Sequence, residues 1–445
     1  MHRLRQHLPL GILLAIAFLT ALGLSLVFPV LPSLVGRSTG GGEVALWAGI
    51  LAATYAGFAL FAGPVLGRLS DRIGRKPVLV ICLAGSAVGW VLFGVGGSIA
   101  VLLVARVIDG ITAGEQSVAF AYLADITEPG ERAKRFGLMG AVSGMAFLVG
   151  PALGGLLAGI DLAAPAFAAA AASALTAVLA LVALPESLPH EKRTSERGLE
   201  LNPFGSLGRT ARVPGMGRRL LVFGLVVATL TVVGSNVSVL SFDVLAWDPV
   251  QIGWLLTGVG IVDIVVQGVL LGILVRALGE RRVVLGGLVG LAAAFAMLVV
   301  IAAAVPSQVL MVVASLLFAT AEGSTTATLQ ATLSESVSED EQGGLAGGLS
   351  AISSAAGLVV PVATGLLYQS VAPAAPYAVA MLGIVVALGL MLRMAGRSVA
   401  GSVADAGAIS GAGAGAGAGS ISGAPASVAR PGSAATPVPV ADAGS

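Results

Sequence analysis

Long apolar runs constrain this chain more than any other feature of its sequence. An apolar helix of about 20 residues is long enough to cross the hydrocarbon core of a bilayer. Runs of 18 or more residues, bounded by charged residues or by Gly and Pro, occur at 8–31, 44–66, 78–97, 99–124, 136–159, 163–184, 219–242, 249–273, 283–304, 307–331, 344–368 and 374–392. They predict an all-α polytopic membrane protein with twelve transmembrane helices, six on each side of a polar segment.

The composition agrees with a membrane protein and excludes several other classes. Of the 445 residues, 56% are apolar and 11% are charged, and the mean hydropathy is +0.97. These values exclude a soluble enzyme, a secreted disulfide scaffold and a nucleic-acid-binding domain. Cys82 is the only cysteine and the three histidines lie near chain ends or loops, so we expect no metal site and no cofactor.

The first apolar run has an alternative interpretation as a signal peptide. The segment MHRLRQHLPLGILLAIAFLTALG has the basic start and the apolar stretch of such a peptide. We favour a first transmembrane helix, because the apolar run continues to Val35 and its removal would leave an odd number of spans.

Basic residues lie on one side of the predicted spans. If the N-terminus is cytosolic, 22 of the 24 Lys and Arg residues fall on its side, while Arg37 falls on the other side and Arg106 lies within a span. Cytoplasmic loops of membrane proteins carry such an excess. We therefore expect a multi-pass protein of the cytoplasmic membrane with both termini in the cytosol.

The chain divides into four segments. We expect a six-helix bundle at 1–185, a polar and proline-containing cytosolic linker at 186–218, a second six-helix bundle at 219–395 and a tail at 396–445. The tail consists mainly of Ala, Gly, Ser and Pro, which bury too little surface to fold, and we expect it to be disordered in the cytosol. Stacked strands of the silk type are the alternative for its GAGAGAGAG repeat.

The two predicted bundles also repeat each other. A shift of 205 residues aligns GRLSDRIGRKP with GILVRALGERR, and a shift of 210 aligns VGPALGGLL with VVPVATGLL. The matched pairs are Gly67/Gly272, Leu69/Leu274, Gly74/Gly279, Pro151/Pro361 and Gly155/Gly365. Because six is an even number, both halves enter the membrane in the same sense and are related by an axis along its normal.

Three motifs carry a resemblance to a known family. The segments GRLSDRIGRKPVL, RVIDGITAG and GPALGG resemble the loop motif, the fourth-span motif and the fifth-span antiporter motif of the major facilitator superfamily. The chain is similar to the twelve-span drug/proton antiporters of that superfamily, and nearest to the tetracycline-exporter branch, over nearly all of 1–395. The resemblance implies the major facilitator fold and export by alternating access.

The loop motif suggests a gate. It contains Gly67, Asp71, Arg72, Gly74, Arg75 and Lys76. Gly67 would allow close backbone approach, and Asp71 could face the free amides at the start of span 11, near Gly343. The loop before that span carries Glu335, Glu339, Asp340 and Glu341, which complement the basic loop. In the alternative, these charges only orient the helices and stay solvated.

The antiporter motif contains Gly150, Pro151, Gly154 and Gly155. Pro151 cannot donate a hydrogen bond to the carbonyl of Phe147, so we expect the helix to be kinked or loosened there. The glycines permit tight helix packing, and a simple packing seam is the alternative. The resemblance to the exporters' motif is what favours export over import.

Five charged residues fall within the predicted spans, where a charge costs about 2.5 to 3.5 kcal/mol on insertion scales: Arg106, Asp109, Glu115, Asp263 and Glu322. Asp109 follows Arg106 by three residues, which predicts an ion pair on one helix face. Glu115 follows Arg106 by nine residues, so we expect it on the opposite face, lining a central cavity whose other wall carries Asp263 and Glu322. The alternative is that Asp109 only neutralises Arg106 and the other acids are hydrogen-bonded in the core.

Glu115 is our first choice for the group that carries a coupled proton, because its own helix offers it no cation. Asp109, beside Arg106, is the second, and Asp263 follows. This chain departs from the tetracycline exporters, which typically carry acids in spans 1, 3 and 9. It has Thr20 and Gly89 at the first two positions and no acid in span 9, so coupling must use the acids that remain.

These observations predict a proton-coupled transporter that exports a small neutral or cationic amphiphile, acting as a monomer in the bilayer. A sugar or metabolite facilitator or importer of the same superfamily is the alternative. An enzyme is disfavoured, because His190-Glu191 lacks the second histidine of a zinc motif, with Thr194 in its place, and no GxSxG segment occurs. A receptor or scaffold is disfavoured because no soluble sensory domain is present, and we expect no nucleic-acid partner.

Overall fold

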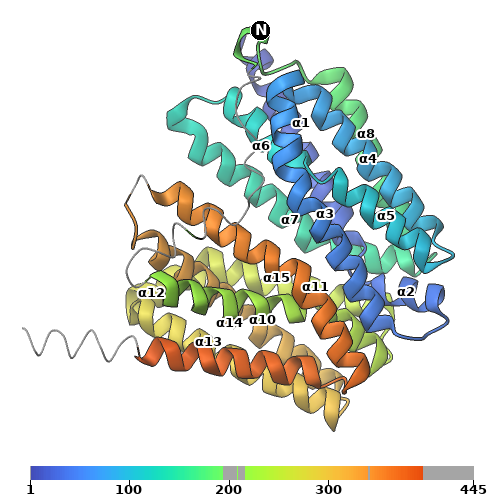
Figure 1. The fold of residues 1–445 in the computed structure, drawn as a ribbon, viewed down its shortest axis with the longest axis vertical. Helices are drawn as coiled ribbons and strands as arrows, with labels where there is room; N and C mark the ends of the chain where they lie inside the picture. Colours follow the sequence, from blue (N-terminus) through green and yellow to red (C-terminus); the bar gives the residue numbers. More distant parts are fainter. Residues whose placement is uncertain (1, 194–207, 209–215, 339–340, 394–445) are drawn as a thin grey trace, which may run out of the picture. The chain divides into compact units, whose positions relative to one another are not determined.

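The computed structural model describes residues 2–193, 208, 216–338 and 341–393, and the regular elements in this part of the chain are all helices (Figure 1). The first half contains α1 (His2–Leu26), α2 (Leu31–Thr39), α3 (Val44–Ile73), α4 (Arg75–Val95), α5 (Ile99–Ile111), α6 (Glu115–Asp125), α7 (Arg132–Ala158) and α8 (Ala164–Ala183). The second half contains α10 (Met216–Asp243), α11 (Pro249–Val265), the π-helical turn η3 (Val266–Leu270), α12 (Leu271–Leu278), α13 (Glu280–Ala303), α14 (Gln308–Ser334), α15 (Gln342–Ser370) and a last helix, Ala375–Arg393.

The contacts divide the chain into a compact unit, Met1–Leu392, and a remainder, Arg393–Ser445. The predicted tail 396–445 and most of the predicted linker 186–218 lie outside the described residues. The four-segment division stays a prediction.

Eleven described helices are long and apolar enough to span a membrane. The span predicted at 99–124 differs from the others, because two shorter helices, α5 and α6, form it with a turn at 112–114 between them. The sequence predicted one unbroken helix there, and that prediction is wrong. The remaining predicted spans each correspond to one helix or, for 249–273, to the continuous run of α11, η3 and α12.

The turn between α5 and α6 is held by a hydroxyl and by close packing. Thr112 Oγ1 donates to the carbonyl oxygens of Ile108 and Asp109, at 2.8 and 3.3 Å, and so satisfies backbone acceptors where the helix ends. Gly85 of α4 faces the same threonine, and a Cβ on Gly85 would lie 2.8 Å from Thr112 Cβ. Only a residue without a side chain lets the two helices approach this closely.

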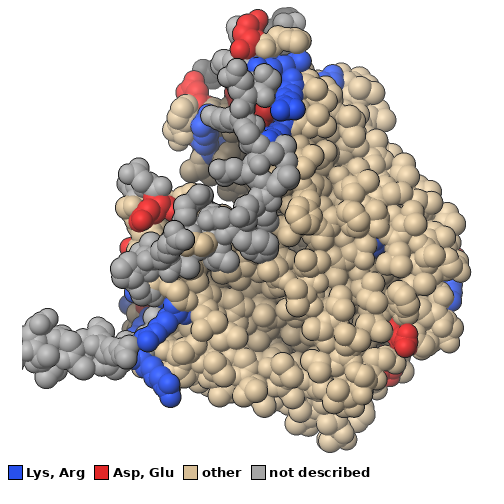
Figure 2. Space-filling model, viewed as in Figure 1, with Lys and Arg blue, Asp and Glu red and all other residues tan. Residues whose placement is uncertain are grey.

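Each half has its own apolar core. In the first half, α4 packs against α5 and α8, and α1 packs against α7 and α8. In the second, α13 packs against α14 and α10 against α15. Other large apolar side chains face outward, among them Val182 and Val309, which are 78% and 74% exposed. Such outward apolar faces suit a lipid environment, and Figure 2 shows charged side chains gathered at the ends of the molecule rather than on its middle.

The two ends of the helices differ in charge. We call the end with the segments 73–75, 126–131, 184–193, 278–280 and 335–338 the linker side, and the opposite end the far side. Among the described residues, Arg37 lies in α2 on the far side and Arg106 lies within α5, while the other Lys and Arg residues are at the helix ends and loops of the linker side. The positive-charge asymmetry predicted from the sequence is therefore present in the fold.

The halves repeat each other at the positions that the sequence matched. Gly74 ends α3 with φ 112° and ψ 157°, and Gly279 ends α12 with φ 81° and ψ 150°. Each glycine also precedes the first residue of the following helix. A positive φ is a conformation that glycine adopts without strain, which explains why both halves need glycine at this point.

The halves contact each other on the far side through α3 with α15 and α7 with α11. In the first contact, a Cβ on Gly365 would lie 2.6 Å from the carbonyl oxygen of Ala45, and Gly49 lies against the carbonyl of Pro361. The second contact repeats it: Gly155 lies against the carbonyl of Pro249, and Gly253 against that of Pro151. We call these four glycines, with the backbone that they face, the far-side seal.

Contacts of this kind are absent at the glycines of the same helices on the linker side. Within the described residues, no atom from a neighbouring segment lies within 4 Å of where a Cβ would be on Gly67 of α3 or Gly343 of α15. The same holds for Gly140 of α7 and Gly268 of η3. Among the described residues, the close approach expected at Gly67 is therefore absent in this arrangement, in which the far-side seal is formed.

Candidate functional site

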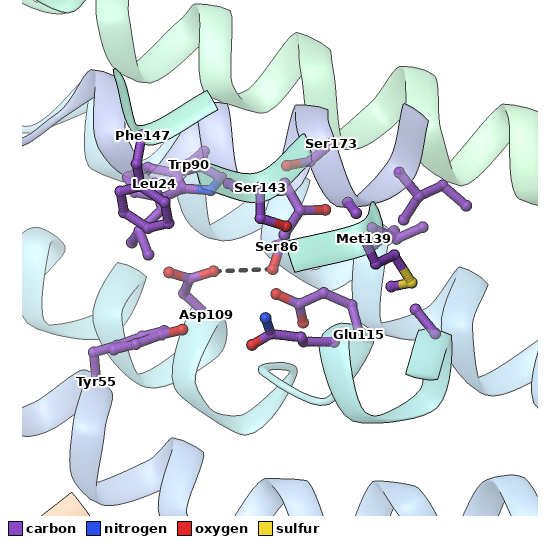
Figure 3. A pocket seen from close by; sticks show the side chains of 17 residues that line it. Leu24, Tyr55, Ser86, Trp90, Asp109, Glu115, Met139, Ser143, Phe147 and Ser173 are labelled. Atoms are coloured by element: carbon purple, nitrogen blue, oxygen red, sulfur yellow. Dashed lines mark hydrogen bonds between the residues drawn. The ribbon is translucent and has the colours of Figure 1, made fainter. Parts of the chain in front are cut away.

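A cavity of about 130 Å³ lies inside the first half, between the helices from α1 to α8 (Figure 3). Apolar side chains such as Leu24, Leu83 and Met139 form part of its wall. Its polar lining consists of Thr20, Tyr55, Ser86, Asp109, Glu115, Gln116, Ser143 and Ser173. We call it the acidic cavity, because two carboxylates border one small space within the membrane.

The predicted ion pair between Arg106 and Asp109 is confirmed. Arg106 Nη1 lies 3.3 Å from Asp109 Oδ2, and the two side chains are only 9% and 5% exposed. Ser86 Oγ donates to the other carboxylate oxygen, Oδ1, at 2.9 Å. A Cβ on Gly89 of α4 would lie 3.2 Å from Asp109 Cβ, so the absence of a side chain at 89 leaves the room that Asp109 occupies.

Aromatic rings hold the guanidinium of Arg106. Its Cζ lies 4.4 Å from the ring centre of Trp90 and 4.3 Å from that of Phe93, with the ring of Tyr55 at 5.9 Å. The Nε and Nη2 groups have no hydrogen-bond partner. A desolvated cation over such a ring is stabilised by about 2 kcal/mol or more. The rings and Asp109 together therefore hold the guanidinium in place and use its binding capacity.

Glu115 is the first residue of α6 and borders the same cavity as Asp109. Its Oε2 is buried without a hydrogen-bond partner, and no ion pair of the described residues includes it. Figure 3 shows both carboxylates directed into one space, with the Ser86 hydroxyl between them in this view.

The expectation that Glu115 and Asp109 face different spaces is therefore wrong. A rotation of 100° per residue holds only along a continuous helix, and the turn at 112–114 redirects the chain between these two residues. Hydropathy gave no sign of this turn.

The two remaining acids lie together in the second half. Gln267 Nε2 donates to Asp263 Oδ1 at 2.7 Å, within the run where α11 passes into the π-helical turn. A Cβ on Gly323 of α14 would lie 2.6 Å from the same oxygen, so Asp263 is beside the residue that follows Glu322. Glu322 lines a separate cavity of about 270 Å³. The structure thus forms two acidic groups, one in each half.

The loop motif forms a network on the linker side. Arg75 Nη1 pairs with Asp71 Oδ1 at 2.7 Å, and Arg75 Nε pairs with Asp125 Oδ2 at 3.1 Å. Glu186 accepts hydrogen bonds from the backbone N–H groups of Arg75 and Lys76, at 2.8 and 3.3 Å. A carboxylate at a helix start satisfies free amides and the helix dipole, so Glu186 fixes α4 to the beginning of the linker.

Sequence reasoning missed Asp125 and Glu186. Their position after spans 4 and 6, on the same side as the basic loop, was the signal that could have found them. The predicted partner of Asp71, the start of α15, forms no hydrogen bond or ion pair with it among the described residues, and Glu339 and Asp340 lie outside them. The latch between Asp71 and α15 stays a prediction.

The antiporter-motif glycines are packed against other helices. Gly150 lies against Ser25 of α1, and a Cβ on Gly154 would lie 2.8 Å from the carbonyl carbon of Leu26. Gly155 belongs to the far-side seal. α7 continues as a helix through Pro151, so the motif joins α7 to α1 on one face and to α11 on another. Its role in export stays a prediction.

A repeated pair of six-span halves, with charged side chains enclosed in each, defines a membrane transporter. The family model described as Major Facilitator Superfamily matches residues 13–244 and 220–416, and the chain belongs to this superfamily. The family resemblance and the fold class predicted from the motifs are confirmed, and the protein is a transporter rather than an enzyme.

Relatives give the branch of the superfamily. The chain is 33% identical over 363 residues to the class G tetracycline resistance protein of Vibrio anguillarum, covering 82% of this chain and 91% of the relative. It is 32% identical over 276 residues to multidrug resistance protein 2 of Bacillus subtilis (strain 168), covering 61% and 68%. The crystal structure of the human organic anion transporter MFSD10 (TETRAN) shares the fold, with a TM-score of 0.61 and 21% identity over 87% of this chain and 99% of that one.

Proposed function

We propose that this transporter exports a small neutral or cationic amphiphile in exchange for protons that move inward. The observation that carries the proposal is the acidic cavity, where one carboxylate is paired with a buried cation and the other has no charged partner. Buried ionisable residues within a membrane commonly form proton relays. The names of the drug-resistance relatives support export as the direction and a drug-like compound as the cargo.

Glu115 is the group to which we assign the coupled proton. Asp109 is already bound by Arg106 and Ser86, and a change in its charge would leave the guanidinium without a counter-ion. Glu115 can gain or lose a proton without breaking an ion pair. For a neutral cargo, a proton that moves through 100 mV yields about 2.3 kcal/mol, which supports a substrate gradient of roughly fifty-fold, since 1.4 kcal/mol is a factor of ten. Exchange of one proton for one monovalent cation moves no net charge, so the pH difference alone drives it.

In alternating access, the helix pairs α3 with α15 and α7 with α11 would lose their far-side contacts and gain contacts on the linker side. We assign the arrangement with the far-side seal formed to the state that is open on the linker side. In the opposite state the linker-side ends would close, Gly67 would approach α15 and Asp71 would face the amides at the start of that helix. We place the linker side in the cytosol and treat the protein as a monomer.

A transport assay tests the proposal. The full-length protein would be reconstituted in vesicles with an imposed pH gradient and supplied with a panel of amphiphiles that includes tetracycline. We expect at least one compound to accumulate against its gradient and the accumulation to stop when the pH gradient is dissipated. Equilibration without accumulation would refute proton coupling and support a facilitator.

Orientation is tested separately with a reporter that is active only in the cytosol. Fused after Gly401 it should be active, and inserted at Gly41 it should be silent. The reverse result would refute the twelve-span arrangement with both termini in the cytosol.

A further inference from the structure

The second cavity, of about 270 Å³, lies between α10, α11 and α14 and is bordered by Phe28 from the turn between α1 and α2. Its wall is mostly apolar and includes Leu230, Val233, Leu255 and Val259. Two aromatic side chains, Phe28 and Phe318, also line it, as do Ser238, Ser315 and Glu322. Pockets for small molecules have this composition, with an apolar wall and few polar groups.

Ser315 is a polar group without a partner. It is only 4% exposed, and its Oγ has no hydrogen-bond partner in the described part of the chain. On the same helix the hydroxyls of Thr320, Ser324 and Thr328 donate to the carbonyl four residues earlier. A buried hydroxyl without a partner costs about 1–3 kcal/mol. Ser315 is therefore available to a bound molecule in a way that its neighbours are not.

The charge of the cavity selects the sign of its ligand. None of the ion pairs in the described part of the chain includes Glu322, and the nearby acid, Asp263, adds negative charge. Arg106, the cation within the spans, is occupied in the other half by Asp109 and aromatic rings. An anion would be repelled by the two carboxylates. A cation would be attracted by Glu322, and the aromatic side chains of Phe28 and Phe318 line the same space, where a ring face can attract positive charge.

The volume limits the size of the ligand. A protein cavity of about 150 Å³ accepts benzene, so about 270 Å³ holds one or two rings with a small charged group. We expect a ligand of this size to fill the cavity better than the four fused rings of tetracycline.

We propose that the cavity of Phe28, Ser315 and Glu322 is the substrate site and binds a compact organic cation of one or two rings, with its ammonium group at Glu322 and a hydrogen-bond acceptor at Ser315. This rests on the proposed export function and assigns its cargo. Phe28 belongs to the first half and the other lining residues to the second, so the ligand touches both halves while the far-side seal is closed.

Binding to the purified full-length protein, measured by calorimetry without any gradient, tests the site. The probes are benzyltrimethylammonium, its 4-methoxy derivative, the uncharged isostere neopentylbenzene, benzoate and tetracycline. We expect the two cations to bind and the isostere to bind at least tenfold more weakly. Equal binding of cation and isostere, or tighter binding of benzoate or tetracycline, would overturn the proposal.

Three variants locate the binding. Glu322→Gln should weaken both cations at least tenfold and leave the isostere unchanged. Ser315→Ala should weaken only the methoxy compound, by several-fold, while the control Ser324→Ala changes neither, because that hydroxyl is bonded within its own helix. Unchanged cation binding in Glu322→Gln, with the thermal unfolding midpoint retained, would refute the site.

The two proposals can fail separately. Binding that depends on Glu322 without pH-driven accumulation would refute proton-coupled export alone. Accumulation of a compound by a Glu322→Gln variant with unaltered affinity would refute this site alone.

Discussion

Gly365→Ala should shift the protein away from the state sealed on the far side. The added Cβ would lie 2.6 Å from the carbonyl oxygen of Ala45 and 2.8 Å from Leu46 Cα. These are backbone atoms and cannot rotate away. Overpacking of this kind costs about 1–3 kcal/mol, and the cost applies only while the seal is closed. The equilibrium between the two states should therefore move by roughly 5- to 150-fold toward the open far side.

Cysteine accessibility measures this shift. In a Cys82→Ser background, a reporter cysteine at Ala48, which is 2% exposed on α3, should react faster with a membrane-impermeant maleimide when Gly365→Ala is added. The labelling rate should rise by the factor by which the equilibrium moves, roughly 5- to 150-fold. Because the structure repeats, Gly155→Ala should act in the same direction, since its Cβ would lie 2.6 Å from the Pro249 carbonyl oxygen.

A matched control separates this effect from a general effect of alanine. Gly286 of α13 is exposed, and nothing lies within 4 Å of where its Cβ would be. Gly286→Ala gains the same helix propensity, about 1 kcal/mol, and should leave the labelling rate unchanged. Equal labelling in Gly365→Ala and the parent, with both folded, would refute the seal, as would an equal increase in the Gly286→Ala control.

Three further substitutions test the proposed mechanism. Glu115→Gln should abolish pH-driven uphill transport but preserve downhill exchange, measured in vesicles; accumulation with unaltered proton stoichiometry would move the assignment to Asp109. Asp109→Asn should lower the thermal unfolding midpoint, because removing one partner of a buried pair costs about 3–5 kcal/mol and leaves Arg106 uncompensated; an unchanged midpoint would argue against that pairing. Asp71→Asn should slow transport with little loss of binding, and crosslinks between 71 and Gly344 should form mainly when the far side is open; crosslinking in every state would make the contact merely structural.

The sequence was most informative where the signal was local or periodic. Apolar runs located the spans, and the three-residue spacing of Arg106 and Asp109 predicted their pair, because both depend on helix geometry alone. The match of Gly74 with Gly279 predicted two loops that share one backbone conformation.

What the sequence did not reveal depends on contacts between distant segments. The turn after Ile111 is invisible to hydropathy, since the residues on both sides are apolar enough for one span, and Thr112 stabilises it together with Gly85 from another helix. The cap that Glu186 places on α4 joins residues 111 positions apart. The division of the acids between two cavities likewise required the packing of α11 against α14.

The turn between α5 and α6 has a further consequence for water. The first amides of a helix have no partner within it, and an interrupted helix is tolerated at membrane depth only inside protein or beside a water-filled space. Gln116 and Ser117 are exposed and Gln116 lines the acidic cavity, so we expect water to reach the amides that open α6. Amide hydrogen exchange should therefore be fast at residues 115–117 and slow from Val118 onward, because the Val118 N–H donates to the Gly114 carbonyl. The interrupted helix would thus admit water to the acidic cavity and give protons a path to Glu115.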